Sequence, residues 1–122
     1  MVLVDTSVWI QHFRKGHPRL TTLLDSGAVA CHDFIIGELA CGRIGNRKEI
    51  LSLLGALPKA EVAEFTEVLF FIEENQLEGL GLGFVDVSLL ASTRITNIPI
   101  WTLDKKLRAV ANRLKVLFEI VK

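Results

Sequence analysis

The sequence lacks the charge excess, the cysteine motifs and the long apolar runs that mark several classes of protein. Its 14 basic side chains balance 14 acidic ones, so no strong overall field draws it to nucleic acid or to an anionic membrane. Its two cysteines, Cys31 and Cys41, form no CxxC and have no zinc-binding spacing. No apolar run approaches the about 20 residues of a membrane helix, and no basic segment of a signal peptide opens the chain.

What remains is a chain of 122 residues, half of them apolar. That length and apolar content predict one compact domain, residues 1–122, with a core of its own. Two thiols beside a full apolar core are typical of a reducing compartment. We therefore expect a cytoplasmic protein with no membrane partner.

Basic side chains are also missing from one part of the chain. Residues 60–93 carry seven acids and no Lys or Arg, whereas residues 94–122 carry seven basic and two acidic side chains. Solvated helix faces account for most of these charges. The uneven distribution still predicts that different faces meet different partners.

Short apolar segments alternate with helical patterns along the chain. Strands are predicted at residues 2–4, 28–32, 98–102 and 116–121. Helices are predicted at residues 6–16, 17–27, 33–42 (with Asp33 as N-cap), 46–57, 64–77, 84–95 and 104–114. Residues 58–62 are ambiguous, and 79–83 form a glycine turn. This alternation predicts an α/β fold, a three-layer α/β/α domain with a central parallel sheet.

Two carboxylates directly follow predicted strands. Asp5 comes after "VLV", and Asp104 comes after "IPIWT" and one leucine. In an open parallel sheet, sites form beyond the carboxyl ends of the strands. Helix N-capping is the other explanation for either aspartate, because aspartate is a good N-cap.

Two further acids are isolated in apolar helical segments. Glu38 is the only charge in "FIIGELAC", and Asp86 is the only charge in "LGLGFVDVSLLAS". A carboxylate in such a setting is costly unless it faces a cleft, a partner or a metal. A cap or a buried ion pair could explain either acid alone, but four such acids together favour a shared site.

Converging carboxylates repel one another, so a cation is expected among them. Oxygen-only ligands suit Mg²⁺ or Mn²⁺. Such ions can clamp a phosphate and lower the pKa of a bound water. The three histidines do not compete for this role, because their spacing pairs none of them.

Four short segments, in this order, resemble the PIN domain, and most closely the VapC-type toxins of toxin–antitoxin pairs: "LVDTSVWI", "GEL", "GFVDVSLLAS" and "IWTLDKKL". The resemblance spans essentially the whole chain. It implies a PIN-like fold and an endoribonuclease that cleaves single-stranded or looped RNA with Mg²⁺ or Mn²⁺. It also implies a homodimer, held inactive by a VapB-type antitoxin whose C-terminal segment lies across the toxin's groove.

The resemblance also assigns roles to individual residues. It implies that the core metal ligands are Asp5, Glu38 and Asp86, with Asp104 as a more peripheral fourth acid acting through water. It implies small polar supports at Ser7 and Thr102. The basic residues nearest these motifs are candidates for the RNA backbone: Arg14, Lys15, Lys105, Lys106 and Arg108. Just beyond the predicted helix of Glu38, similar candidates are Arg43, Arg47 and Lys48. An apolar surplus is expected to form part of a dimer or antitoxin interface: Trp9, Phe13, Phe70, Phe71 and Ile72.

Two other classes of function remain open at this point. One is a PIN-like module that binds RNA or protein without cleavage, although four intact acids count against it. The other is a receiver-like phosphoryl-transfer domain. Such domains typically have neighbouring acids at the first strand, whereas Asp5 is the only acid there. Transfer RNA, ribosomal RNA loops and messenger RNA all fit as substrates.

Overall fold

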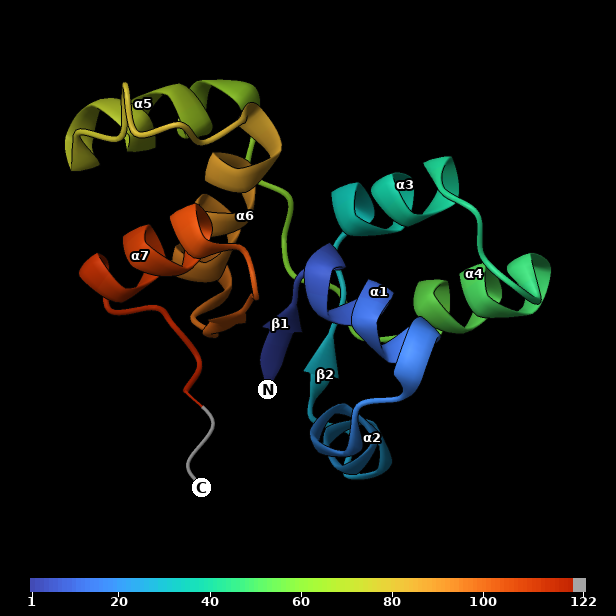
Figure 1. Ribbon diagram of the computed structural model, residues 1–122. Helices are drawn as coiled ribbons and strands as arrows, with labels where there is room; N and C mark the ends of the chain where they lie inside the picture. The colour runs from blue at the N-terminus through green and yellow to red at the C-terminus, as the bar shows by residue number, and fades with distance from the viewer. Residues whose placement is uncertain (120–122) are drawn as a thin grey trace.

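A three-stranded parallel sheet in the order β2-β1-β3 lies at the centre of the computed structural model, which describes residues 1–119 (Figure 1). The strands are β1 (Val2–Val4), β2 (Val29–Ala30) and β3 (Ile100–Trp101). In β1, Leu3 pairs with Ala30 on one side and with Ile100 on the other. All three residues of β1 are buried, which is why this strand is a continuous apolar run without polar alternation.

Seven helices are present among the described residues, with bounds close to those predicted. They are α1 (Thr6–Lys15), α2 (Pro18–Asp25), α3 (Asp33–Cys41), α4 (Arg47–Ala56), α5 (Phe65–Asn75), α6 (Phe84–Thr96) and α7 (Lys105–Arg113). Figure 1 shows α1, α3 and α4 to one side of the sheet and α6 and α7 to the other, with α5 packed on α6. The α/β prediction with a central parallel sheet is confirmed.

Two segments beside the three strands each form a single bridge within the described residues. Leu117 pairs in parallel with Ile100, and Lys59 pairs with Cys31. The strand predicted at residues 116–121 is therefore only this one bridge within the described part, and its residues 120–121 lie outside the described residues. The ambiguous segment 58–62 supplies the other bridge.

One predicted helix cap is wrong. Asp33 is the first helical residue of α3, and the N-cap is the preceding His32, whose side chain accepts a hydrogen bond from the Phe34 amide. Asp33 instead forms an ion pair with Lys59 (2.9 Å). Sequence rules favour aspartate over histidine as a cap, but here the buried imidazole is held in place from a second helix, as described below.

No helix within residues 1–119 is both long and apolar enough to cross a membrane.

Candidate active site

Asp5 lies where β1 ends and α1 begins, and only 6% of it is exposed. Its backbone amide donates to the Trp101 carbonyl of β3 (2.9 Å). Its carboxylate oxygen Oδ2 accepts hydrogen bonds from Ser7 Oγ and Thr102 Oγ1, both at 2.8 Å. Asp5 is also the N-cap of α1. The first strand therefore delivers a buried carboxylate that two hydroxyl groups hold in one orientation.

The end of β3 is tied to the same network. Thr102 Oγ1 accepts from the Asp104 amide (3.1 Å), and Ser7 Oγ accepts from the Leu103 amide (2.9 Å). Asp104 is the N-cap of α7, and its Oδ1 accepts from the Leu107 amide (2.9 Å). Ser7 and Thr102 thus join the carboxyl ends of two neighbouring strands, and with them Asp5 and Asp104.

Glu38 reaches this edge from α3. Thr6 Oγ1 donates to Glu38 Oε1 (2.7 Å), so the residue after Asp5 orients the second acid. Glu38 is exposed, although its helix is apolar, because Ile35 and Leu39 supply the buried face of α3. The free-energy cost of burying a carboxylate is avoided here, because Glu38 faces a surface pocket rather than the core.

Asp86 is half-buried in the first turn of α6. Burial raises the pKa of its carboxyl, a hydrogen bond from the Gly83 amide (3.2 Å) opposes that shift, and the charges of Asp5 and Asp104 raise the pKa further. Three acids from three separate segments therefore lie near enough to repel one another.

The four carboxylates share a pattern of hydrogen bonding. Each has one oxygen that accepts a hydrogen bond, and its other oxygen accepts none from residues 1–119. Within the same residues the one ion pair is Lys59 with Asp33, so no Lys or Arg neutralises any of the four. The candidate site is therefore a set of oriented, uncompensated carboxylate oxygens, to which Glu38 is connected through Thr6.

Helix capping explains where three of these acids lie but not their charge. Asp5 and Asp104 are N-caps, and Asp86 bonds the Gly83 amide from the first turn of α6. Asparagine caps a helix about as well as aspartate. Capping alone therefore does not require a charge, and the helix dipole favours a carboxylate at each helix start by only about 0.3–1 kcal/mol, whereas three such charges near one another repel.

A divalent cation fits this donor set. Mg²⁺ and Mn²⁺ prefer carboxylate oxygens, and a 2+ charge would relieve the repulsion that raises the pKa of Asp86. No three His, Cys, Asp or Glu side chains within residues 1–119 form a ready-made metal cage. Mg²⁺ does not need one, because it usually keeps several waters and takes one or two protein carboxylates.

The candidate RNA-binding residues divide between several places. Arg14 lines the same surface pocket as Glu38. The Lys106 ammonium lies beside Gly81 in the glycine turn that precedes α6. Lys105 and Arg108 line a separate hollow along α7. Lys15 is exposed at the end of α1.

Sequence reasoning missed two parts of this arrangement. One is Thr6, whose adjacency to Asp5 in "VDTS" was the available signal. The other is a buried bridge between α3 and α6, in which His32 Nε2 lies 3.0 Å from Ser92 Oγ. Nothing in the spacing of residues 32 and 92 indicates that contact.

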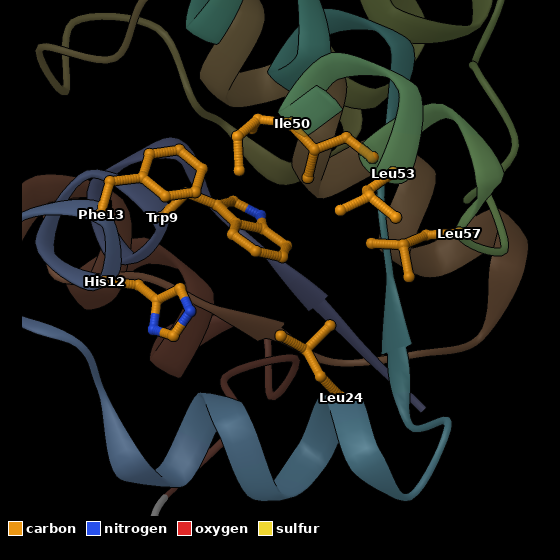
Figure 2. Close-up of a pocket in the computed structure, with 8 residues that line it drawn as sticks. Trp9, His12, Phe13, Leu24, Ile50, Leu53 and Leu57 are labelled. Carbon is orange, nitrogen blue, oxygen red and sulfur yellow. The ribbon is translucent and has the colours of Figure 1, made fainter. Parts of the chain in front are cut away.

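An apolar pocket of about 340 Å³ lies between α1, α2 and α4. Figure 2 shows Trp9 and Phe13 of α1, Leu24 of α2 and Ile50 and Leu53 of α4 turned toward this common space. Phe13 lines both this pocket and the one that contains Glu38. The apolar pocket is therefore adjacent to the acidic site along α1.

Known proteins resemble this chain in both sequence and structure. Residues 2–113 match the PIN domain family. Ribonuclease VapC32 from Mycobacterium tuberculosis, in strains CDC 1551 / Oshkosh and ATCC 25618 / H37Rv, is 44% identical over 110 residues, which cover 89% of this chain and 89% of the relative. The crystal structure of PAE2754 from Pyrobaculum aerophilum superposes with a TM-score of 0.60 at 20% identity, covering 89% of this chain and 78% of that one. The chain therefore belongs to the PIN-domain family, and within that family to the VapC ribonucleases.

Proposed function

We propose that this chain is a metal-dependent endoribonuclease that hydrolyses phosphodiester bonds in RNA, and that it acts as the toxin of a toxin–antitoxin pair. One observation carries the proposal: four carboxylates at one sheet edge are each oriented through one oxygen and have no cationic partner within residues 1–119. The 44% identity to Ribonuclease VapC32 supports the substrate class. We take residues 1–122 as one nuclease domain working on cytoplasmic RNA.

The chain's own residues prepare the site for catalysis. Ser7 and Thr102 fix the Asp5 carboxylate, and Thr6 fixes Glu38, so the ligands lose little rotational freedom when a cation binds. Asp5, Glu38 and Asp86 are the proposed core ligands of Mg²⁺ or Mn²⁺, directly or through the waters that such an ion keeps, with Asp104 more peripheral and acting through water. The bound cation supplies neutralisation of phosphate charge and a more acidic water.

A cleavage assay with metal removal tests this function. Total bacterial RNA is incubated with the antitoxin-free protein in Mg²⁺, in Mn²⁺ and in excess chelator, and new 5′ ends are mapped. We expect discrete cuts that disappear with chelator and return when either ion is added back. Cleavage at an unchanged rate in chelator would contradict the metal role. Absence of cuts from a folded sample under every condition would instead favour a PIN-like binding module.

For the antitoxin we propose the apolar pocket between α1, α2 and α4. Leu53, of which 59% is exposed, lines this pocket together with Trp9 and Phe13. Because Phe13 also lines the Glu38 pocket, an antitoxin segment seated here continues directly toward the acids. Such a segment would present apolar side chains at helical spacing.

For the homodimer we propose the outer face of α5 and α6. Phe70 is 67% exposed there, and Phe65, Leu69 and Ile95 are also exposed. The rings of Phe65 and Phe84 pack at this surface in a tilted arrangement, with centroids 5.7 Å apart and an interplanar angle of 40°. Exposed apolar side chains gathered on one face are typical of an interface with another chain, and this face is distinct from the proposed antitoxin pocket.

The variant Leu53→Asp tests the proposed antitoxin pocket, and Phe70→Asp tests the proposed dimer face. Each variant is the control for the other. Leu53→Asp is expected to weaken antitoxin binding by about thirtyfold or more, as for a central interface anchor, and to leave the dimer intact. Phe70→Asp is expected to shift the protein to monomer at low micromolar concentration and to retain antitoxin binding. Calorimetric titration and light scattering measure the two effects. A result with the two variants exchanged would contradict both assignments.

A further inference from the structure

The pocket that contains Glu38 has a composition unlike the apolar one. It encloses about 430 Å³ between the second half of α1 and the end of α3 with the loop that follows. Its apolar wall comes from Ile10, Phe13, Leu39 and Ile44, and its charged wall from Arg14, Arg43 and Glu38. A volume of this size is within the about 300–1,000 Å³ of small-ligand pockets.

The two arginines are available for a ligand. Both are exposed, and neither has an ion-pair partner within residues 1–119. Glu38, the acid in the same pocket, has one oxygen engaged by Thr6 and is a proposed cation ligand. With a 2+ ion at the acids, the charge that faces this pocket is positive, so the pocket fits an anionic ligand.

We infer that this pocket seats one unpaired nucleotide of the RNA, adjacent to the phosphate that is cleaved. The inference rests on the proposed nuclease function. Phe13 and the aliphatic side chains offer an apolar surface for a base. Arg14 and Arg43 offer guanidinium forks for the flanking phosphates. Only an unstacked base can enter such a pocket, so the site selects loops and single strands.

Cleavage kinetics of the double variant Arg14→Ala/Arg43→Ala test the inference. Arg19→Ala is the matched control, because Arg19 is an exposed arginine on α2 outside this pocket. We expect KM to rise about tenfold or more in the double variant with kcat within about twofold, since binding rather than chemistry is affected. The slope of log KM against log salt should fall by about 0.7 for each phosphate that the variant no longer binds. Values equal to those of Arg19→Ala would overturn the inference.

An abasic substrate series identifies the seated base. RNAs are made with one abasic residue at each position flanking the mapped cut. We expect one position at which the abasic residue raises the KM of the wild-type protein about tenfold, and at which the effect largely disappears in the double variant. That coupling requires the base and the arginines to act at one place. Equal abasic effects in both proteins would overturn the inference, as would loss of antitoxin binding with unchanged RNA affinity.

A binding measurement keeps this test separate from that of the proposed function. Anisotropy of a fluorescent single-stranded RNA is measured with wild type, the double variant and Arg19→Ala in Ca²⁺, which keeps a 2+ charge at the acids, and binding is read without any need for cleavage. If the wild type binds RNA but never cuts it, the nuclease proposal fails and the pocket is still tested. If the double variant binds as tightly as wild type, the pocket fails whatever the cleavage assay gives.

Discussion

Replacing Asp5 with asparagine is expected to lower RNA cleavage by about a thousandfold or more and to leave the fold intact. The variant removes one negative charge from the buried member of the acid cluster. Metal stabilisation of a phosphoryl transition state is worth several kcal/mol, and about 4 kcal/mol corresponds to a factor of about a thousand.

The fold should tolerate this change because asparagine keeps the structural roles of Asp5. Its carbonyl oxygen can accept the hydroxyls of Ser7 and Thr102, and asparagine is an equally good N-cap for α1. Removing a charge that repels Asp86 should hold the melting temperature level or raise it in metal-free buffer.

Cleavage rate, circular dichroism and melting temperature are measured together for this variant. Asp25→Asn serves as the control, since Asp25 is an exposed aspartate at the end of α2. Unchanged cleavage by Asp5→Asn would show that the assigned site is wrong. Loss of both activity and secondary structure would show that the charge itself is structural.

Replacing His32 with alanine is expected to lower the free energy of unfolding of the domain by about 3 kcal/mol. His32 is fully buried. Its Nδ1 accepts the Phe34 amide hydrogen at 3.0 Å, so Nε2 carries the ring proton and donates to Ser92 Oγ at 3.0 Å. The alanine variant loses a cap worth about 1 kcal/mol and leaves a buried hydroxyl unpaired at about 1–3 kcal/mol.

This bridge is relevant to the proposed site because it joins the helices that carry two of the proposed ligands. Glu38 is on α3 and Asp86 is on α6. His32→Asn is the informative companion, since asparagine restores the cap but is too short to repeat the contact with Ser92. Urea unfolding at pH 8 should rank wild type above His32→Asn, and His32→Asn above His32→Ala. Equal stability of all three would contradict the bridge.

The same residue gives stability a definite pH dependence. Burial lowers the pKa of His32, and the charge of Asp33, itself paired with Lys59, opposes this shift only in part. The buried thiol of neighbouring Cys31 has a pKa raised by burial and stays neutral in this range. A histidine with a lowered folded pKa binds more protons when unfolded, so its contribution is complete above about pH 6.5 and is lost as pH falls below that value.

Urea titrations from pH 8 to pH 5 measure this effect. His12 also has a pKa lowered by burial, with the charge of His17 adding to the shift, and the raised pKa of Asp86 acts in the opposite direction toward the acid end, so the wild-type slope has several sources. The difference between wild type and His32→Asn isolates the share of His32. A difference that stays constant across this pH range would contradict a neutral, buried His32.

The elements of this domain could be predicted from sequence wherever local pattern decides them. The run "VLV" before Asp5 indicates β1, and "FVDVSLLASTRI" indicates α6 almost to the residue. Within residues 116–119 the predicted strand is a single bridge, because apolar residues at the edge of a sheet give the same sequence pattern whether they pair at one position or at several. The cap of α3 was wrong because the partner of His32 lies 60 residues away.

Sequence alone was enough for the fold class and the family, and it singled out the four proposed acids, because strand ends and isolated charges in apolar segments are local features of the chain. How those acids are held depends on contacts between distant segments. The hydroxyl of Thr102 reaches Asp5 across 97 positions, and that of Thr6 reaches Glu38 across 32. The tertiary structure also decided that Arg14 and Arg43 line one pocket with Glu38. Such contacts depend on the order β2-β1-β3 and on helix packing, and no local periodicity encodes either of these.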